Sequence, residues 1–276
     1  MGGRAAWLLA AILLVGLALR VWGLAFGLPN ISCRPDESTL VHRALAIGAG
    51  DPNPHFFNYP SLHFYLLAAV YGAYYIAGFM GGVFENTAIF EAQFLKDPSV
   101  FYLIGRGLGA LMGIASVGVL YSIGTRLGGV LVGLASALFL SCCFLHVRDS
   151  HFLTVDIPAT FYLLVSILFS LRYMEGRAVR NLIVGAIFLG LSASTKYNLG
   201  LFAGVVLIVA YQKSDSLRAN GGRLCWVVGV MAAAFIAGSP YVLLDFATFW
   251  RDLSYERLHF ARGHEADLGR GWWYHL

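Results

Sequence analysis

The sequence contains few charged residues. Only 12% of its 276 residues are Asp, Glu, Lys or Arg, whereas 58% are hydrophobic, and a soluble domain carries about twice that share of charge. The composition therefore excludes an ordinary soluble domain and predicts an all-α polytopic membrane protein. The net charge is +4, but the cations are dispersed and form no basic run. We therefore expect no nucleic-acid partner.

Cysteine and metal-binding motifs are also scarce. Two of the four cysteines, Cys142 and Cys143, are neighbours within an apolar run, so neither a disulfide framework nor a Cys-x-x-Cys metal site is predicted. The eight histidines show no His-Glu-x-x-His spacing, so a zinc site would have to draw ligands from distant loops. We expect no resident metal or cofactor, with a divalent cation as the alternative.

The hydrophobic residues are concentrated in long segments. The first, 5–27, is interrupted only by Arg20 and exceeds the roughly 20 residues that a helix needs to cross a bilayer. It is long for a signal peptide and is followed by no small-x-small cleavage site, so we expect a retained anchor. The other segments are 62–83, 101–123, 130–146, 157–171, 182–193, 199–211 and 224–243.

The basic loops predict which of these segments cross the membrane. Short loops rich in Lys and Arg stay in the cytoplasm, and three occur, at Arg126, at 172–180 and at 213–223. Arg4 joins them on one side only if 62–83 does not cross. We therefore predict that 62–83 is a juxtamembrane or re-entrant hairpin, which leaves seven spans and a cytoplasmic N-terminus. If 62–83 crosses instead, Arg4 and the chain after 243 change sides relative to the basic loops.

Four glycines favour a break within this predicted hairpin. They are Gly72, Gly78, Gly81 and Gly82.

A single membrane module, 1–276, is predicted. It consists of the first span, a long outer loop at 28–100, six further spans within 101–243 and a second outer loop at 244–276. The last residues, "GWWYHL", have the aromatic character of a further span entering the membrane. We therefore expect the chain to be part of a longer protein.

The stretch "SCRPDEST", 32–39, places two acids beside the first span. Pro35 suits the first turn of a helix, where the helix dipole favours the negative charges of Asp36 and Glu37. Asp36 and Arg43 share one face of that helix, and the opposite face is apolar. The pattern predicts an amphipathic helix on the membrane surface, with simple helix capping as the alternative.

Two further outer loops carry charge. In "HVRDSHFLTVDIPATF", 146–161, Asp156 precedes a predicted helix start and Arg148 lies nearby. In "STKYN", 194–198, Lys196 is the single cation of a tight turn. Arg106 lies a few residues into the second span, where a cation needs a partner or a wet cavity. Anchoring or capping is the alternative for Asp156, Arg148 and Lys196 taken alone, whereas Arg106 is harder to explain in that way.

Taken together, these residues place carboxylates and cations on one side of the membrane at headgroup level. A carboxylate can deprotonate an attacking hydroxyl, and cations can stabilise the charge on a departing phosphate. The pattern therefore predicts transfer chemistry at a lipid phosphate. The alternatives are an ion-coupled secondary transporter, whose site would normally lie near the bilayer midplane, and a non-catalytic scaffold.

Five stretches resemble GT-C class membrane glycosyltransferases in their order along the chain. They are "RPDE", "FFNYPSLHFYL", "LIGRGLGALMGIASVGVLYSIGTRLGG", "RDSHFLTVDIPATF" and "GLSASTKYN". The chain is most similar to the bacterial family that includes protein O-mannosyltransferases and lipid A aminoarabinose transferases. The resemblance covers nearly the whole chain.

This resemblance implies a GT-C-like module of about seven transmembrane helices with juxtamembrane helices in its first outer loop. It implies inverting transfer of a hexose or pentose from a polyprenyl-phosphate donor to a hydroxyl of a lipid, glycan or protein. The expected location is the bacterial inner membrane, with membrane lipids around it and the active site facing the periplasm or exterior. The implied residues are Asp36, Glu37 and Asp156 in catalysis, Arg106, Arg148 and Lys196 at the donor phosphate, and Tyr59 and His259 at the substrate.

The chain departs from these relatives in two places. The aminoarabinose transferases carry Glu-Lys-Pro-Pro-Leu where residues 58–62 read Asn-Tyr-Pro-Ser-Leu, so a carboxylate metal ligand and a cation are missing. The β-trefoil insertion of eukaryotic mannosyltransferases is also absent from this sequence. The first departure weakens any transfer of the metal site or of the sugar, and the second makes the eukaryotic enzymes the poorer match.

Overall fold

The computed structural model describes residues 3–211 and 215–262, the last four of these by backbone alone. Within these ranges the chain is helical and contains no strand. Five described helices are long and apolar enough to cross a membrane, which confirms an all-α polytopic membrane protein. They are α1 (Gly3–Val21), α3 (Leu62–Met80), α5 (Ser99–Cys142), α7 (Asp156–Gly176) and α10 (Leu217–Gly238).

Shorter helices connect these five. Two apolar ones lie between α7 and α10: α8 (Val179–Ala193), and η2 (Tyr197–Phe202) continued by α9 (Ala203–Ala210). The others are η1 (Ile31–Cys33), α2 (Pro35–Gly48), α4 (Thr87–Lys96), α6 (Phe144–Asp149), α11 (Tyr241–Leu244) and α12 (Phe246–Arg262).

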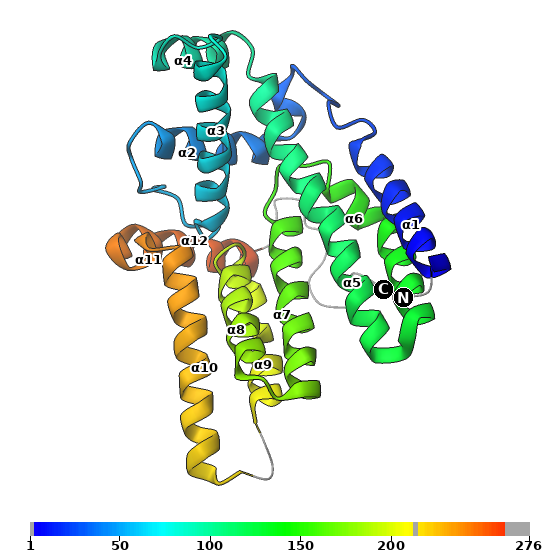
Figure 1. Cartoon of the computed structure of the whole chain (residues 1–276). Helices are drawn as coiled ribbons and strands as arrows, with labels where there is room; N and C mark the ends of the chain where they lie inside the picture. The colour runs from blue at the N-terminus through cyan, green and yellow to red at the C-terminus, as the bar shows by residue number, and fades with distance from the viewer. Residues whose placement is uncertain (1–2, 212–214, 263–276) are drawn as a thin grey trace.

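The predicted segment 101–123 lies in the first limb of α5 and most of 130–146 forms the second, whose last residues already belong to α6. The backbone leaves helical geometry at Gly128 and Gly129, where Gly129 has φ +82°, and Figure 1 shows α5 doubling back at its lower end. Glycine adopts this conformation without the steric cost of a Cβ. The limbs pack closely, because a Cβ at Gly133 would collide with Thr125.

Helix α3 corrects one prediction. It is continuous through Gly72 and Gly78, so these two glycines do not break it as predicted, and the chain turns only after Met80, at Gly81 and Gly82, where Gly82 has φ +72°. Gly78 instead makes room for the ring of Phe84, since a Cβ there would collide with that ring. Helix α3 packs chiefly on α2, and Figure 1 shows both beyond the end of α10. Because α3 is long and apolar enough to cross, its predicted position outside the bilayer stays a prediction.

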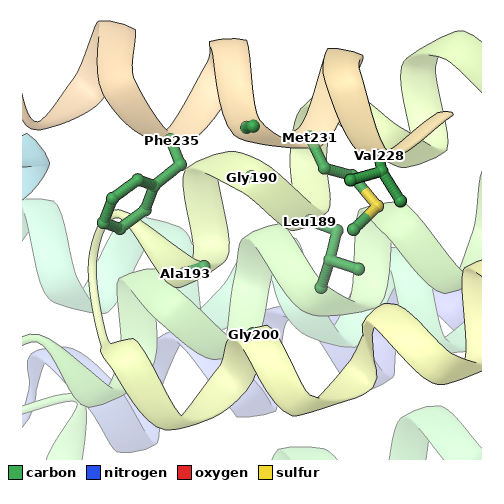
Figure 2. Close-up of a pocket in the computed structure, with 8 residues that line it drawn as sticks. Leu189, Gly190, Ala193, Gly200, Val228, Met231 and Phe235 are labelled. Carbon is green, nitrogen blue, oxygen red and sulfur yellow. The ribbon is translucent and has the colours of Figure 1, made fainter. Parts of the chain in front are cut away.

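Helices α7 to α10 form the other half of the molecule. Helix α8 packs on α7, α9 and α10, around a core that includes Leu182, Leu189, Val206 and Val227. A cavity of about 220 Å³ lies between α8, η2 and α10 (Figure 2). Its lining is apolar throughout: Leu189, Gly190, Ala193, Gly200, Val228, Met231, Ala232 and Phe235. It offers no group for acid–base or phosphate chemistry.

The cation within the first span has carbonyl partners. Helix α1 ends at Val21, earlier than predicted, and positive φ angles at Gly23 and Gly27 turn the chain. The buried Arg20 guanidinium donates to the carbonyls of Leu140 and Ser141, at 3.1 and 3.2 Å, and contacts His146 Nδ1 at 2.8 Å. Those carbonyls belong to the last turn of α5, which carries partial negative charge. Arg20 therefore holds α1 against α5.

Candidate active site

Asp156 and Lys196 meet where α7 begins and α8 has just ended. Helix α7 starts at Asp156, as predicted, with Pro158 in its first turn. Lys196 Nζ lies 2.5 Å from Asp156 Oδ1. The two side chains are 35% and 45% exposed, and a pair this exposed contributes little to stability. Lys196 is therefore available to bind an anion that arrives from outside the protein.

Glu37 and Arg106 form a buried ion pair. Arg106 Nε and Nη2 donate to the two carboxylate oxygens of Glu37 at 3.0 and 2.7 Å, and both residues are at most 1% exposed. Glu37 also accepts the Leu153 amide at 2.8 Å. The remaining guanidinium nitrogen, Nη1, donates to the carbonyls of Leu24 and Phe26 at 2.8 and 2.9 Å. This bidentate geometry is the favourable form of a buried pair.

The pair supplies the partner that Arg106 was expected to need, and it connects four segments. Glu37 lies in the first turn of α2, Arg106 in α5, and Leu153 three residues before Asp156, and the fourth segment is the turn after α1 whose carbonyls accept from Arg106. Because Asp36 directly precedes Glu37, this contact fixes the start of α2 relative to the start of α7. The side chains of Glu37 and Arg106 point into the protein, and their predicted contacts with substrate stay predictions.

Asp36 differs from this buried pair in its exposure to solvent. It is exposed in the first turn of α2 and takes part in no hydrogen bond or ion pair with the described residues. Burial, followed by the charges of Asp36, Asp156 and Glu256, raises the pKa of the half-buried Tyr59 phenol. The three carboxylates therefore lie near that phenol, whose hydroxyl stays protonated at neutral pH and can donate a hydrogen bond. The predicted residues Asp36, Tyr59 and Asp156, with Lys196 paired to Asp156, thus lie in one region of the molecule.

Glu256 was missed by the sequence reasoning. It lies on α12, and its carboxylate accepts a hydrogen bond from the Asn58 side-chain amide. One turn earlier, Asp252 accepts the Phe57 amide at 2.9 Å. The available signal was the spacing of two acids four residues apart on an amphipathic helix after the last predicted span, which places both on one face.

The other predicted site residues are placed differently. Arg148 lies on α6 and pairs with its neighbour Asp149 at 2.8 Å. His259 belongs to α12, but its side chain lies outside the described residues, as do Lys213 and the predicted span entry at 271–276. Within the described ranges, no group of three or more His, Cys, Asp and Glu side chains could hold a metal ion.

This arrangement combines three chemical capacities in one place. Asp36 is an exposed carboxylate that can accept a proton, Tyr59 is a hydrogen-bond donor, and Lys196 is a cation suited to phosphate. A reaction in which a hydroxyl attacks and a phosphate departs needs these groups together.

Comparison with known proteins agrees with this chemistry. The family model described as dolichyl-phosphate-mannose-protein mannosyltransferase matches residues 100–243, more than half of the chain. The match includes Arg106, Arg148, Asp156 and Lys196, whereas Asp36, Tyr59 and α12 lie outside it. Neither the curated proteins nor the solved structures gave a match. The chain belongs to the dolichyl-phosphate-mannose-protein mannosyltransferase family and is therefore a membrane glycosyltransferase of the kind that uses a polyprenyl-phosphate-linked sugar.

Proposed function

We propose that the protein transfers a sugar from a polyprenyl-phosphate donor to an acceptor hydroxyl at the outer face of a bacterial inner membrane. The observation that carries this proposal is the exposed Asp36 carboxylate, which pairs with none of the described residues and lies near Tyr59, as does the Asp156–Lys196 pair. The acceptor is a lipid, a glycan or a protein, and the sugar is a hexose or a pentose.

Asp36 acts as the general base. It takes the proton of the acceptor hydroxyl as that oxygen forms a bond to the anomeric carbon of the donor sugar. The bond between the anomeric carbon and the phosphate oxygen breaks, and its electron pair leaves with the phosphate. Attack on the face opposite the departing phosphate inverts the anomeric centre.

Lys196 stabilises the charge that develops on the leaving phosphate. Its ammonium is held at 2.5 Å by Asp156, so it is already oriented before the donor binds. Asp156 thereby positions the cation, and Tyr59 offers a hydroxyl to the sugar or to the acceptor. The predicted contact of Arg148 with the donor phosphate falls to its Nη1, because Nε and Nη2 bind Asp149, and the contact of His259 with substrate stays a prediction.

Glu37 and Arg106 serve the reaction indirectly in this proposal. Arg106 Nε and Nη2 donate to Glu37 and Nη1 donates to two backbone carbonyls, so every guanidinium nitrogen of Arg106 has a protein acceptor. We therefore assign them the placement of Asp36 relative to Asp156, and not contact with the phosphate.

The outward orientation of the proposed site is supported by the charged residues at the other end of α5 and α7. Arg126, next to the turn of α5, forms an ion pair with Glu175 at the end of α7. Two of the basic loops therefore lie together, at the end of α7 opposite Asp156. Basic loops are retained in the cytoplasm, which supports an outer position for Asp156 and Lys196.

The function is tested by giving the purified protein a panel of polyprenyl-phosphate sugars, beginning with the mannose derivative, in lipid nanodiscs. We expect consumption of one donor together with release of polyprenyl phosphate, and mass spectrometry of glycolipids and glycoproteins from cells with and without the gene identifies the product. Vesicle uptake of a solute in the absence of any lipid donor, without sugar transfer, would favour a transporter and overturn the proposal.

A further inference from the structure

Helix α12 contacts the loop that carries Tyr59. Asn53 donates to Asp245 at 2.8 Å, the Phe57 amide donates to Asp252 at 2.9 Å, and the Asn58 amide donates to Glu256. The rings of Phe57 and Phe249 pack edge to face with centroids 6.0 Å apart. The loop and the helix are nearly 200 residues apart in sequence, so these contacts are tertiary and specific to the fold.

The contacts come from one face of the helix. Positions 245, 249, 252 and 256 recur at intervals of three and four residues, which places them in one row. Trp250 and Leu258 lie away from this row and are exposed. Helix α12 therefore directs its acidic face towards the protein, against the usual tendency of acids to face water.

Glu256 differs from the other acids in this row. Asp252 is nearly buried and also pairs with Arg251, and Asp245 also lies near His55. Glu256 has no ion pair with any cation among the described residues, and its hydrogen-bond partner is the neutral amide of Asn58. Asp245, Phe249 and Asp252 already attach α12 to the loop, so a purely structural attachment does not need a fourth contact at Glu256.

Asn58 immediately precedes Tyr59, and the Phe57 carbonyl accepts a hydrogen bond from the Tyr197 hydroxyl at 3.1 Å. Tyr197 in turn follows Lys196. The backbone at 57–58 is thus held from both sides, by α12 and by the turn that carries the Lys196 cation. Where this backbone lies determines where the Tyr59 hydroxyl lies relative to Asp36 and Asp156.

We propose that Glu256 is a positioning residue of the reaction, which acts through Asn58 to hold Tyr59 near Asp36 and Asp156. This inference rests on the proposed function. It assigns a part in substrate placement to α12, a helix outside the region matched by the family model.

The test is a double-mutant cycle on transfer from polyprenyl-phosphate mannose, or from whichever polyprenyl-phosphate sugar the wild-type protein consumes. Glu256→Ala and Asn58→Ala should each lower kcat on the order of tenfold, because a small displacement of a positioned group slows a reaction strongly, while the donor KM changes little. Because both act through one contact, the double variant should be no slower than either single variant. Glu256→Gln, which keeps an acceptor oxygen for Asn58, should retain near wild-type kcat.

Arg257→Ala, on the exposed row of α12, is the matched control and should be silent. Additive losses in the double variant would overturn the inference, because they show that Glu256 acts independently of Asn58. A Glu256→Gln variant as slow as Glu256→Ala would also overturn it, because it shows that Glu256 acts by its charge. If Glu256→Ala does not fold, the comparison of Glu256→Gln with Asn58→Ala still decides the point.

A second measurement does not depend on activity. In a variant whose native cysteines are replaced by serine, Asn58→Cys and Glu256→Cys should be joined by a short bifunctional thiol reagent, whereas Asn58→Cys with Arg257→Cys should not. Failure of the first pair to react overturns the contact itself. Efficient crosslinking without transfer by the wild-type protein from any polyprenyl-phosphate sugar overturns the proposed function instead.

Discussion

At the scale of single residues, the ion pair between Glu37 and Arg106 is the contact on which the site most depends. Loss of one partner leaves the other charge buried without a counterion. Glu37→Gln or Arg106→Gln should therefore lower the free energy of unfolding by about 3–5 kcal/mol. Thermal unfolding in detergent measures this change, and an unchanged midpoint would contradict the structural role assigned to the pair.

The ion pair between Asp156 and Lys196 should behave in the opposite way. Since both side chains are partly exposed, Lys196→Met should change the free energy of unfolding by less than about 1 kcal/mol. Loss of a charge-assisted hydrogen bond to the donor phosphate should raise the donor KM or lower kcat/KM by about 10- to 100-fold. Normal kcat/KM in a well-folded Lys196→Met protein would remove Lys196 from the site.

The residues also show how far the sequence predicts the site. Asp36, Asp156 and Lys196 could be placed on one side because helix-start and loop signals are local. The pairing of Glu37 with Arg106 and of Asn58 with Glu256 joins residues far apart in sequence, so no local pattern indicates it. A buried acid and an exposed acid also look alike in "PDE", although Glu37 is buried and Asp36 is exposed.

At the scale of elements, most spans follow from apolar length, and the differences arise at glycines. Glycine was taken as a sign of a break in 62–83, but Gly78 lies within α3 because Phe84 needs the space. The same residue type does turn the chain at Gly129, where φ is positive. Only the packing partners distinguish these two uses of glycine, and the sequence does not contain them.

Helix α12 makes a prediction of its own. It follows α10 and α11 and exposes Trp250 and Leu258 on the face turned away from Glu256, so that face should lie in the lipid interface. A nitroxide at position 250 should collide more often with lipid-soluble oxygen than with a water-soluble nickel complex, relative to one at the exposed Arg251. Equal accessibility of the two positions would contradict an interfacial α12.

At the scale of the whole molecule, the account requires one sidedness for the seven predicted spans. Single-cysteine variants of the protein are labelled in right-side-out spheroplasts. Native Cys33, which is exposed just before α2, should react with an impermeant maleimide. Arg177→Cys, in the basic loop after α7, should react only after permeabilisation. Labelling of the second position in intact spheroplasts would contradict the predicted orientation.

The same assay decides the position of α3. Met80 is exposed at the end of this helix, and Met80→Cys should react from outside if α3 does not cross the membrane. Reaction only after permeabilisation would make α3 a span.

The central claim is that Asp36 removes the proton from the acceptor hydroxyl. The most direct measurement is the rate of sugar transfer by Asp36→Asn in nanodiscs, with Glu91→Gln, an exposed acid on α4, as the control. The account predicts that Asp36→Asn loses roughly 10²- to 10⁴-fold in kcat while its unfolding midpoint and donor binding stay close to those of the wild type, and that Glu91→Gln is unaffected. Transfer by a well-folded Asp36→Asn protein at a near-normal rate would contradict the claim.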